Sequence, residues 1–114
     1  GEATARRLAA SGAKLAVLDV DAKRASEFSA SSGMLAITAD VADEKAIEAA
    51  FERVLAELGP ISILVNCAGI AAPGSVVRKG MAMPLDEFRR VVDVNLLGTL
   101  NCIRCAVAQM INAA

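Results

Sequence analysis

Three short apolar runs alternate with segments of helical periodicity, and this alternation limits the folds open to the chain. The runs cover residues 14–18, 34–39 and 61–65 of 114. A continuous apolar run of this length is typical of a strand covered on both faces, and such strands alternate with helices in parallel sheets. The sequence therefore predicts an α/β fold with a parallel sheet. Its length predicts one domain over residues 1–114.

Helices are expected between and after these strands, from apolar spacing and from residues that begin or end helices. In chain order they cover residues 1–11, 21–29 with a frayed end before Gly33, 44–58 after a cap at Asp43, and 85–114 with a kink near 95–98. Residues 70–84 are expected to form a loop. Because the last helix is apolar nearly all round, we expect it to be buried against the sheet and against a partner subunit.

The composition excludes several kinds of site. The chain has no His, so it can contain neither a His-ligated metal nor a Ser-His-Asp triad, and it has no Tyr, so it lacks a phenol acid. We predict no metal. A formal net charge of −1 without a basic stripe argues against nucleic acid as a partner. No apolar run reaches the length of about eighteen residues that spans a membrane, so no membrane contact is expected. Three Cys without a secretory signal predict a cytoplasmic location, or the mitochondrial matrix of a eukaryote.

Each apolar run is followed by a polar residue: Asp19, Asp40 and Asn66. In parallel sheets, ligands bind at the carboxyl ends of the strands. Asp19 stands 18 positions after Gly1, which fits an acidic residue that binds the ribose hydroxyls of NAD if Gly1 closes a phosphate-binding turn. The same carboxylate would repel the 2′-phosphate of NADP. The alternative for Asp19 is a turn or helix-cap residue, aided by Asp21.

The second and third strand ends offer polar groups of other kinds. Asp40 and Val41 supply a carboxylate acceptor and an adjacent backbone donor, which together suit an adenine edge; a simple loop into the next helix is the alternative. In the segment Asn66-Cys67-Ala68-Gly69, the glycine permits close backbone approach and Asn66 can brace the loop. The alternative for this segment is a strand-exit turn.

The last helix contains two further features. Asn95 is a polar amide in an apolar helix and needs a hydrogen-bond partner, so it is either a functional residue or a satisfied kink residue. Cys102 and Cys105 form a C-x-x-C inside the helix, where no helix N-terminus lowers a thiol pKa. We interpret them as inert thiols that act as small hydrophobic side chains.

Taken in order, these segments resemble the short-chain dehydrogenase/reductase family. The matching segments are Gly1–Arg6 at the end of a glycine-rich turn, Val17–Val20, Ala39–Val41, Val65–Gly69 and Val94–Thr99. The resemblance covers essentially the whole chain and implies a Rossmann-like, doubly wound parallel sheet. Cys67 stands where the family usually has a second Asn. The long connection 71–84 and residues 66–71 are similar to those of type II 3-hydroxyacyl-CoA dehydrogenases.

The resemblance implies a role for each site residue. Asp19 would bind the adenosine ribose beside the turn at Gly1, and Asp40 and Val41 would bind adenine. Asn66 would belong to the cofactor site, and the segment from Cys67 through Ala68 to Gly69 would lie along the central ribose region of NAD. Asn95 would belong to a catalytic tetrad and hold a water that links the catalytic Lys to solvent.

The implied reaction is NAD-dependent hydride transfer between the cofactor and a secondary alcohol or ketone. A 3-hydroxyacyl-CoA is the first substrate expected; a hydroxysteroid or 3-oxoacyl substrate of the same family and a non-catalytic nucleotide-binding homologue are the alternatives. The resemblance also implies a homo-oligomer, a dimer or a tetramer, that associates through the helix of residues 96–114.

The family's first strand and its catalytic Ser, Tyr and Lys do not occur in this sequence. In the family's strand order, 3-2-1-4-5, the first strand lies between the strands expected at 14–18 and 61–65. The expected sheet is therefore incomplete and has unpaired backbone groups at the seam. We expect an internal portion of a longer enzyme that is inactive alone; a cooperative, monomeric unfolding transition of residues 1–114 would contradict this.

A phospho-accepting signalling module is a rival from another class, with Asp19, Asp21 and Asp40 as an acidic pocket. It requires a different strand order and gives no role to residues 66–69. A Mg²⁺-dependent phosphorylation assay separates the two, and we expect no phosphorylation.

Overall fold

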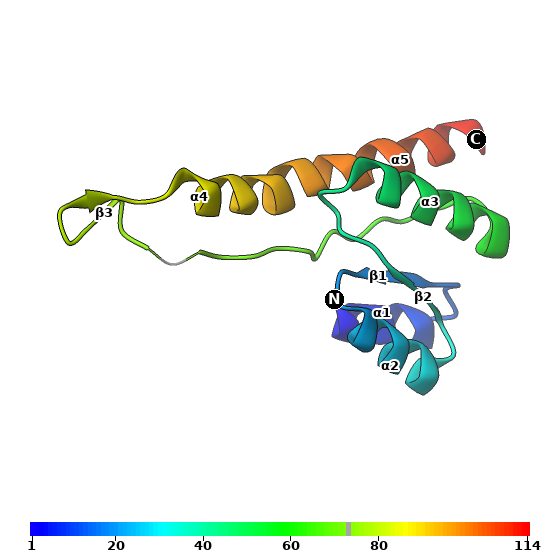
Figure 1. The fold of residues 1–114 in the computed structure, drawn as a ribbon. Helices are drawn as coiled ribbons and strands as arrows, with labels where there is room; N and C mark the ends of the chain where they lie inside the picture. Colours follow the sequence, from blue (N-terminus) through cyan, green and yellow to red (C-terminus); the bar gives the residue numbers. More distant parts are fainter. Residues whose placement is uncertain (73) are drawn as a thin grey trace.

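The computed structural model describes residues 1–72 and 74–114. Strands β1 (Ala16–Asp19) and β2 (Leu35–Thr38) form a parallel pair in which Ala16 lies opposite Leu35. Helices α1 (Glu2–Ala10) and α2 (Ala22–Ser32) cover one face of this pair, and α3 (Glu44–Leu58) lies on the other side (Figure 1). The predicted α/β class and its parallel strands are confirmed.

The main core lies between the sheet and the helices on the α3 side. It consists of buried, mostly small or aliphatic side chains: Ile37, Ala39, Ile47, Ala50, Phe51, Val54, Cys102 and Ala106. Ile47 is completely buried. On the other face of the sheet, Ala5, Ala25 and Phe28 are buried between α1, α2 and the strands. Burial on both faces explains why the strand segments are continuously apolar in sequence.

Residues close in sequence determine where most of the helices begin and end. The Asp43 side chain accepts a hydrogen bond from the Ala46 backbone N–H at 3.0 Å and caps α3, as predicted. Gly33, with φ of 69°, ends α2. The fraying predicted before Gly33 is wrong, because the hydroxyls of Ser31 and Ser32 both donate to the Phe28 carbonyl and α2 continues to Ser32.

The strand predicted at residues 61–65 is wrong as a paired strand. It makes no ladder with any strand in the described part of the chain, because β1 pairs with β2 and no other strand lies beside it. A groove of about 450 Å³ separates this segment from β1, and Leu15–Leu18 and Ile61–Ala68 line its two sides. A strand needs a neighbour for its backbone groups, and no described segment supplies one to residues 61–65.

The loop predicted at residues 70–84 contains a short antiparallel hairpin. Its strands are β3 (Val77–Arg78) and β4 (Met81–Ala82). The two turn residues, Lys79 and Gly80, have φ of 52° and 76°, and positive φ at both positions is what a tight hairpin turn requires. The hairpin projects from one end of the molecule (Figure 1).

One long helical rod forms the C-terminal part of the chain. It consists of α4 (Leu85–Val92), a π-helical segment η1 (Asp93–Leu97) and α5 (Gly98–Asn112) (Figure 1). The kink predicted near residues 95–98 corresponds to this π-helical segment. By length and composition alone the rod could also cross a membrane, although a helix packed in a protein core passes the same test.

The burial predicted for the rod is only partly correct. Val94, Gly98, Cys102 and Ala106 are buried at intervals of four residues, and α5 packs mainly on α3, where Cys102 and Ala106 join the core that also contains Ile37 of β2. Val91, Val92, Cys105 and Met110 are half-buried, and the large apolar residues that are exposed are Leu85, Phe88, Leu96, Leu97, Leu100, Ile103, Val107 and Ile111. The sequence pattern could not show this division, because both faces of the rod are apolar.

The core position of Ile47 provides a test of the fold. We expect Ile47→Ala to lower the free energy of unfolding of the full-length protein by about 2–5 kcal/mol, and Ile47→Val by about 0.5–1.5 kcal/mol, because of the lost contacts and the cavity. Lys45→Ala, at an exposed position of the same helix, is the control and should change it by less than about 0.5 kcal/mol. Urea unfolding measures all three. Equal effects of Ile47→Ala and Lys45→Ala would contradict the packing described.

Candidate functional site

The carboxyl ends of β1 and β2 meet at one edge of the sheet. Asp19 ends β1, and its backbone carbonyl accepts a hydrogen bond from the Ala39 N–H at 3.0 Å, directly before Asp40. The N-terminus of the chain lies at this same end of β1 (Figure 1). The structure therefore brings Asp19, Asp40 and Gly1 to one end of the sheet.

The Asp19 side chain stabilises the turn between β1 and α2. Its Oδ1 accepts a hydrogen bond from the Asp21 N–H at 2.9 Å, and Asp21 in turn caps α2 by accepting from the N–H groups of Lys23 and Arg24. The Oδ2 atom of Asp19 makes no hydrogen bond within the residues that the structure describes. The half-buried carboxylate is thus oriented by the turn and keeps one oxygen for another partner.

Asp40 is held by two donors. Its Oδ1 accepts from the Ala42 backbone N–H at 2.9 Å, and its Oδ2 accepts from the Arg90 guanidinium at 2.9 Å. The bond from Ala42 and the charge and hydrogen bond of Arg90 hold the pKa of this carboxyl below its usual value, although partial burial opposes them. Asp40 is therefore ionised at neutral pH and points in a fixed direction.

The next residue, Val41, contacts the rod. The Asn101 amide donates to the Val41 carbonyl at 2.9 Å, and the Val41 side chain packs on Gly98. A Cβ at Gly98 would come within 2.5 Å of Val41 Cγ2, so any other residue at this position would push the loop away. Sequence reasoning missed Arg90 and Asn101, since nothing near them in sequence marks their partners.

The segment Asn66–Gly69 crosses the same end of the molecule. Asn66, Cys67 and Ala68 line the groove together with Gly1 and Val41. An added Cβ at Gly1 would lie 3.6 Å from Cys67 Cβ, so the start of α1 and this segment are in close approach. Of the predicted site residues, Gly1, Val41, Asn66, Cys67 and Ala68 therefore line one groove, whereas Asp19, Asp40 and Gly69 do not line it.

Asn95 connects this segment to the rod. Its amide nitrogen donates to the Ile70 carbonyl and its Oδ1 accepts from the Ile70 N–H, both at 2.8 Å. The side chain thus pairs with one residue's backbone as a neighbouring strand would. Asn95 lies in η1, so the interpretation as a satisfied kink residue agrees with the geometry.

Cys102 and Cys105 lie within α5 and are free thiols. Burial raises the pKa of both, which disfavours the reactive thiolate. Cys102 belongs to the core beside Phe51 and Ala106. The interpretation as small hydrophobic side chains agrees with these positions. Within the described residues no cluster of His, Cys, Asp and Glu could hold a metal ion.

The profile of the family described as "Enoyl-(Acyl carrier protein) reductase" matches residues 1–114. Human 3-hydroxyacyl-CoA dehydrogenase type-2 is 36% identical over 114 residues, which cover 96% of this chain and 44% of that protein. A mutant of a short-chain dehydrogenase/reductase from Serratia marcescens superposes with a TM-score of 0.84 at 30% identity, over 96% of this chain and 45% of that one.

The chain belongs to the short-chain dehydrogenase/reductase family. It spans less than half the length of the relatives it matches. Members of this family are oxidoreductases that use nicotinamide cofactors and act on small molecules. An incomplete Rossmann-like sheet, as predicted from the sequence, agrees with this partial coverage.

A relative from Xanthobacter autotrophicus is named inactive 2-(S)-hydroxypropyl-CoM dehydrogenase 2. It is 38% identical over 109 residues, which cover 94% of this chain and 46% of that protein. Similarity in this part of the family is therefore compatible with loss of activity.

The Asn95–Ile70 pair gives a second test. Because Asn95→Ala removes two exposed hydrogen bonds worth together about 1–2 kcal/mol, we expect amide hydrogen exchange of Ile70 to accelerate about fivefold to thirtyfold. Asn112→Ala, at the exposed end of the rod, should leave that rate unchanged. Unaltered exchange of Ile70 in Asn95→Ala would show that the pair does not hold the segment.

Proposed function

We propose that the chain forms the dinucleotide-binding part of an NAD-dependent oxidoreductase that transfers hydride between the cofactor and a secondary alcohol or ketone. The observation that carries the proposal is that an oriented acidic side chain ends β1 while Val41 and Asn66–Ala68 meet Gly1 around the adjoining groove. This is the carboxyl edge where open α/β sheets bind ligands. When bound, NAD supplies the hydride acceptor.

Asp19 is the residue proposed to select NAD. The turn bond from Asp21 fixes its Oδ1, which leaves Oδ2 to accept from a ribose hydroxyl. A phosphate on the 2′ oxygen would bring two negative groups together at this point, and that repulsion disfavours NADP.

Asp40 and Val41 are proposed to bind adenine. The carboxylate is ionised and has acceptor positions left after its bonds to Ala42 and Arg90. The Val41 N–H donates no hydrogen bond to any group in the described part of the chain. An exocyclic amine and a neighbouring ring nitrogen would satisfy this acceptor and donor together.

Asn95 is proposed to act as a positioning residue. Both polar atoms of its side chain are engaged with Ile70, so the amide fixes the Gly69–Ile70 backbone beside the cofactor region. One amide N–H and the amide oxygen make these bonds, so the second N–H is left to hold the water of the proposed tetrad. Cys67 and Ala68 would contribute small side chains and backbone to the same wall.

The proposed first substrate is a 3-hydroxyacyl-CoA, which rests on the similarity to human 3-hydroxyacyl-CoA dehydrogenase type-2. A hydroxysteroid or a 3-oxoacyl group has the same reacting alcohol or ketone. A non-catalytic nucleotide-binding protein is the second candidate, favoured by the inactive relative. NAD reduction by the full-length protein with a 3-hydroxyacyl-CoA separates the two: NAD binding without turnover of any secondary alcohol supports the second.

The charge of Asp19 can be tested without removing its turn bond. In Asp19→Asn the amide oxygen can still accept from the Asp21 N–H, but the charge-assisted bond to ribose is lost. We expect the Kd for NAD of the full-length protein to rise about tenfold and the preference for NAD over NADP to fall. Glu27→Gln, which removes an exposed carboxylate on α2, is the control. Calorimetric titration measures both cofactors, and an unchanged preference in Asp19→Asn would remove the proposed role.

We also propose that the exposed apolar face of the rod associates with a second copy of the protein. That face includes Leu96, Leu100, Ile103 and Val107 over consecutive turns, and an exposed apolar patch of this kind marks an association surface. A repeated apolar face on one helix can be self-complementary in a two-fold interface.

The association is tested by sedimentation velocity of the full-length protein. Leu100→Glu puts a charge in the middle of the apolar face, and we expect it to raise the monomer fraction at least about tenfold. Lys23→Glu on α2, far from the rod (Figure 1), is the control and should leave the oligomer intact. A monomeric unsubstituted protein, or an unchanged oligomer of Leu100→Glu, would contradict this interface.

A further inference from the structure

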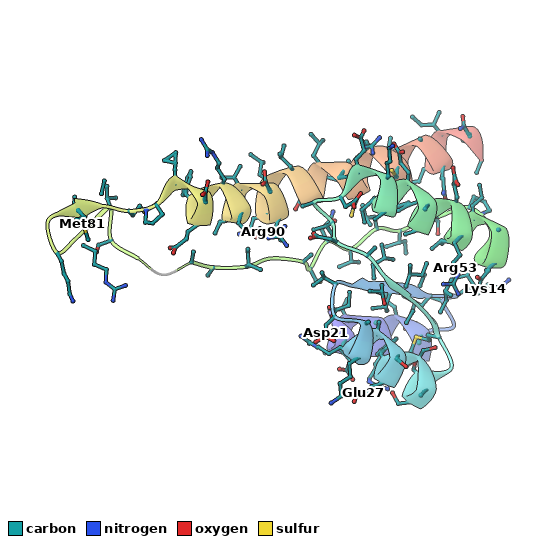
Figure 2. All side chains as sticks on the ribbon, in the orientation of Figure 1. Lys14, Asp21, Glu27, Arg53, Met81 and Arg90 are labelled. Carbon is teal, nitrogen blue, oxygen red and sulfur yellow. The ribbon has the colours of Figure 1, made fainter. Side chains whose placement is uncertain are left out.

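The loop of residues 40–43 is held by side chains from the rod. Arg90 on α4 reaches Asp40 across 50 positions of sequence, with guanidinium and carboxylate 2.9 Å apart. Figure 2 shows Arg90 on the lower side of α4. Asn101 on α5 donates to the carbonyls of Val41, at 2.9 Å, and Asp43, at 3.4 Å. The rod therefore contacts the loop through α4, which precedes η1, and through α5, which follows it.

These contacts fix the directions of the backbone groups in the loop. The peptide unit between Val41 and Ala42 is held at both ends, since its carbonyl accepts from Asn101 and its N–H donates to Asp40 Oδ1. The Asp40 carbonyl accepts from the Asp43 N–H at 3.0 Å. In a trans peptide the N–H points opposite to the carbonyl, so the Val41 N–H points out of the turn.

The Asp40 carboxylate is fixed in the same way. One oxygen is tied to the loop through Ala42, and the other is tied to the rod through Arg90. Two bonds to different oxygens define the plane of the carboxylate, whereas the bond from Ala42 alone would allow it to rotate. The remaining acceptor positions then have a set direction relative to the Val41 N–H.

We propose that Arg90 and Asn101 are positioning residues that determine the specificity of the Asp40–Val41 pair for adenine. This inference rests on the proposed function. Arg90 orients the acceptor, Asn101 orients the donor, and together they keep the two groups at the spacing of an exocyclic amine and its neighbouring ring nitrogen. The ligand class is an adenine dinucleotide, as opposed to one carrying a base with a carbonyl at the same place.

The test compares NAD with nicotinamide hypoxanthine dinucleotide in the full-length protein. In hypoxanthine a carbonyl replaces the amine and the neighbouring ring nitrogen carries a proton, so both proposed bonds are lost. We expect the unsubstituted protein to bind NAD more tightly. In Arg90→Gln and in Asn101→Leu this preference should fall at least about fivefold, mainly by weaker binding of NAD. Arg90→Lys keeps a cation at the position and should retain most of the preference.

Arg89→Gln is the matched control. Arg89 is adjacent in sequence but pairs with Asp86 on its own helix, at 3.2 Å, and does not touch the loop. We expect it to bind both dinucleotides as the unsubstituted protein does. The preference is a ratio of two Kd values for the same folded protein, so a general loss of stability does not produce the expected change.

The outcomes separate this inference from the proposed function. Failure of the unsubstituted protein to bind NAD overturns both. NAD binding without preference over the hypoxanthine analogue, or an equal loss for both dinucleotides in Arg90→Gln and Asn101→Leu, overturns the positioning roles and leaves the NAD site standing. A reduced preference in Arg90→Gln that Arg90→Lys restores supports the inference.

Discussion

Two hydrogen bonds between the Asn95 side-chain amide and the Ile70 backbone connect the rod to the segment of residues 61–70. No strand pairing joins these two parts of the structure. The segment from residue 61 to residue 70 has no ladder partner among the described residues, so its position depends on side-chain contacts. Asn95 supplies a donor and an acceptor with the spacing of a backbone, and thereby substitutes for a neighbouring strand at one point. Three residues later, Gly98 admits Val41. One short stretch of the rod therefore sets the distance between the Asp40 loop and the Gly69 segment.

The electrostatics of the site follow from this arrangement. Asp19 and Asp40 bring two negative side chains to one end of the sheet, and within the described residues only Asp40 has a cation bonded to it, Arg90. The Asp40–Arg90 pair is half-exposed, so its contribution to stability is small. Its effect is directional, because it holds a carboxylate that would otherwise rotate. Asp19 is oriented by a backbone N–H instead and keeps its charge uncompensated, which suits an acceptor for hydroxyl groups and disfavours phosphate.

Features encoded by neighbouring residues could be predicted from the sequence, and features made by distant residues could not. The cap at Asp43, the stop at Gly33 and the distortion near Asn95 depend on residues within one or two turns. The strand state of residues 61–65 depends on a partner elsewhere, and the apolar pattern cannot supply that partner. The same limit applies to Arg90 and Asn101, whose partners lie about 50 and 60 positions away. That Asp19 and Asp40 lie at one edge could be predicted because the carboxyl ends of the parallel strands β1 and β2 meet there.

The π-helical turn determines how the rod responds to a change in its length. Residues 93–97 form a wide turn that holds one residue more than an α-helical turn. Removing one residue there would restore an ordinary helix and leave Cys102 and Ala106 on the α3 interface. Removing one residue from α5 before Cys102 would instead rotate everything after it by about 100°. Cys102 and Ala106 would then leave that interface, and apolar residues from the open side would enter it. The wide turn is thus a place where the rod can lose a residue without a change in the register of the core.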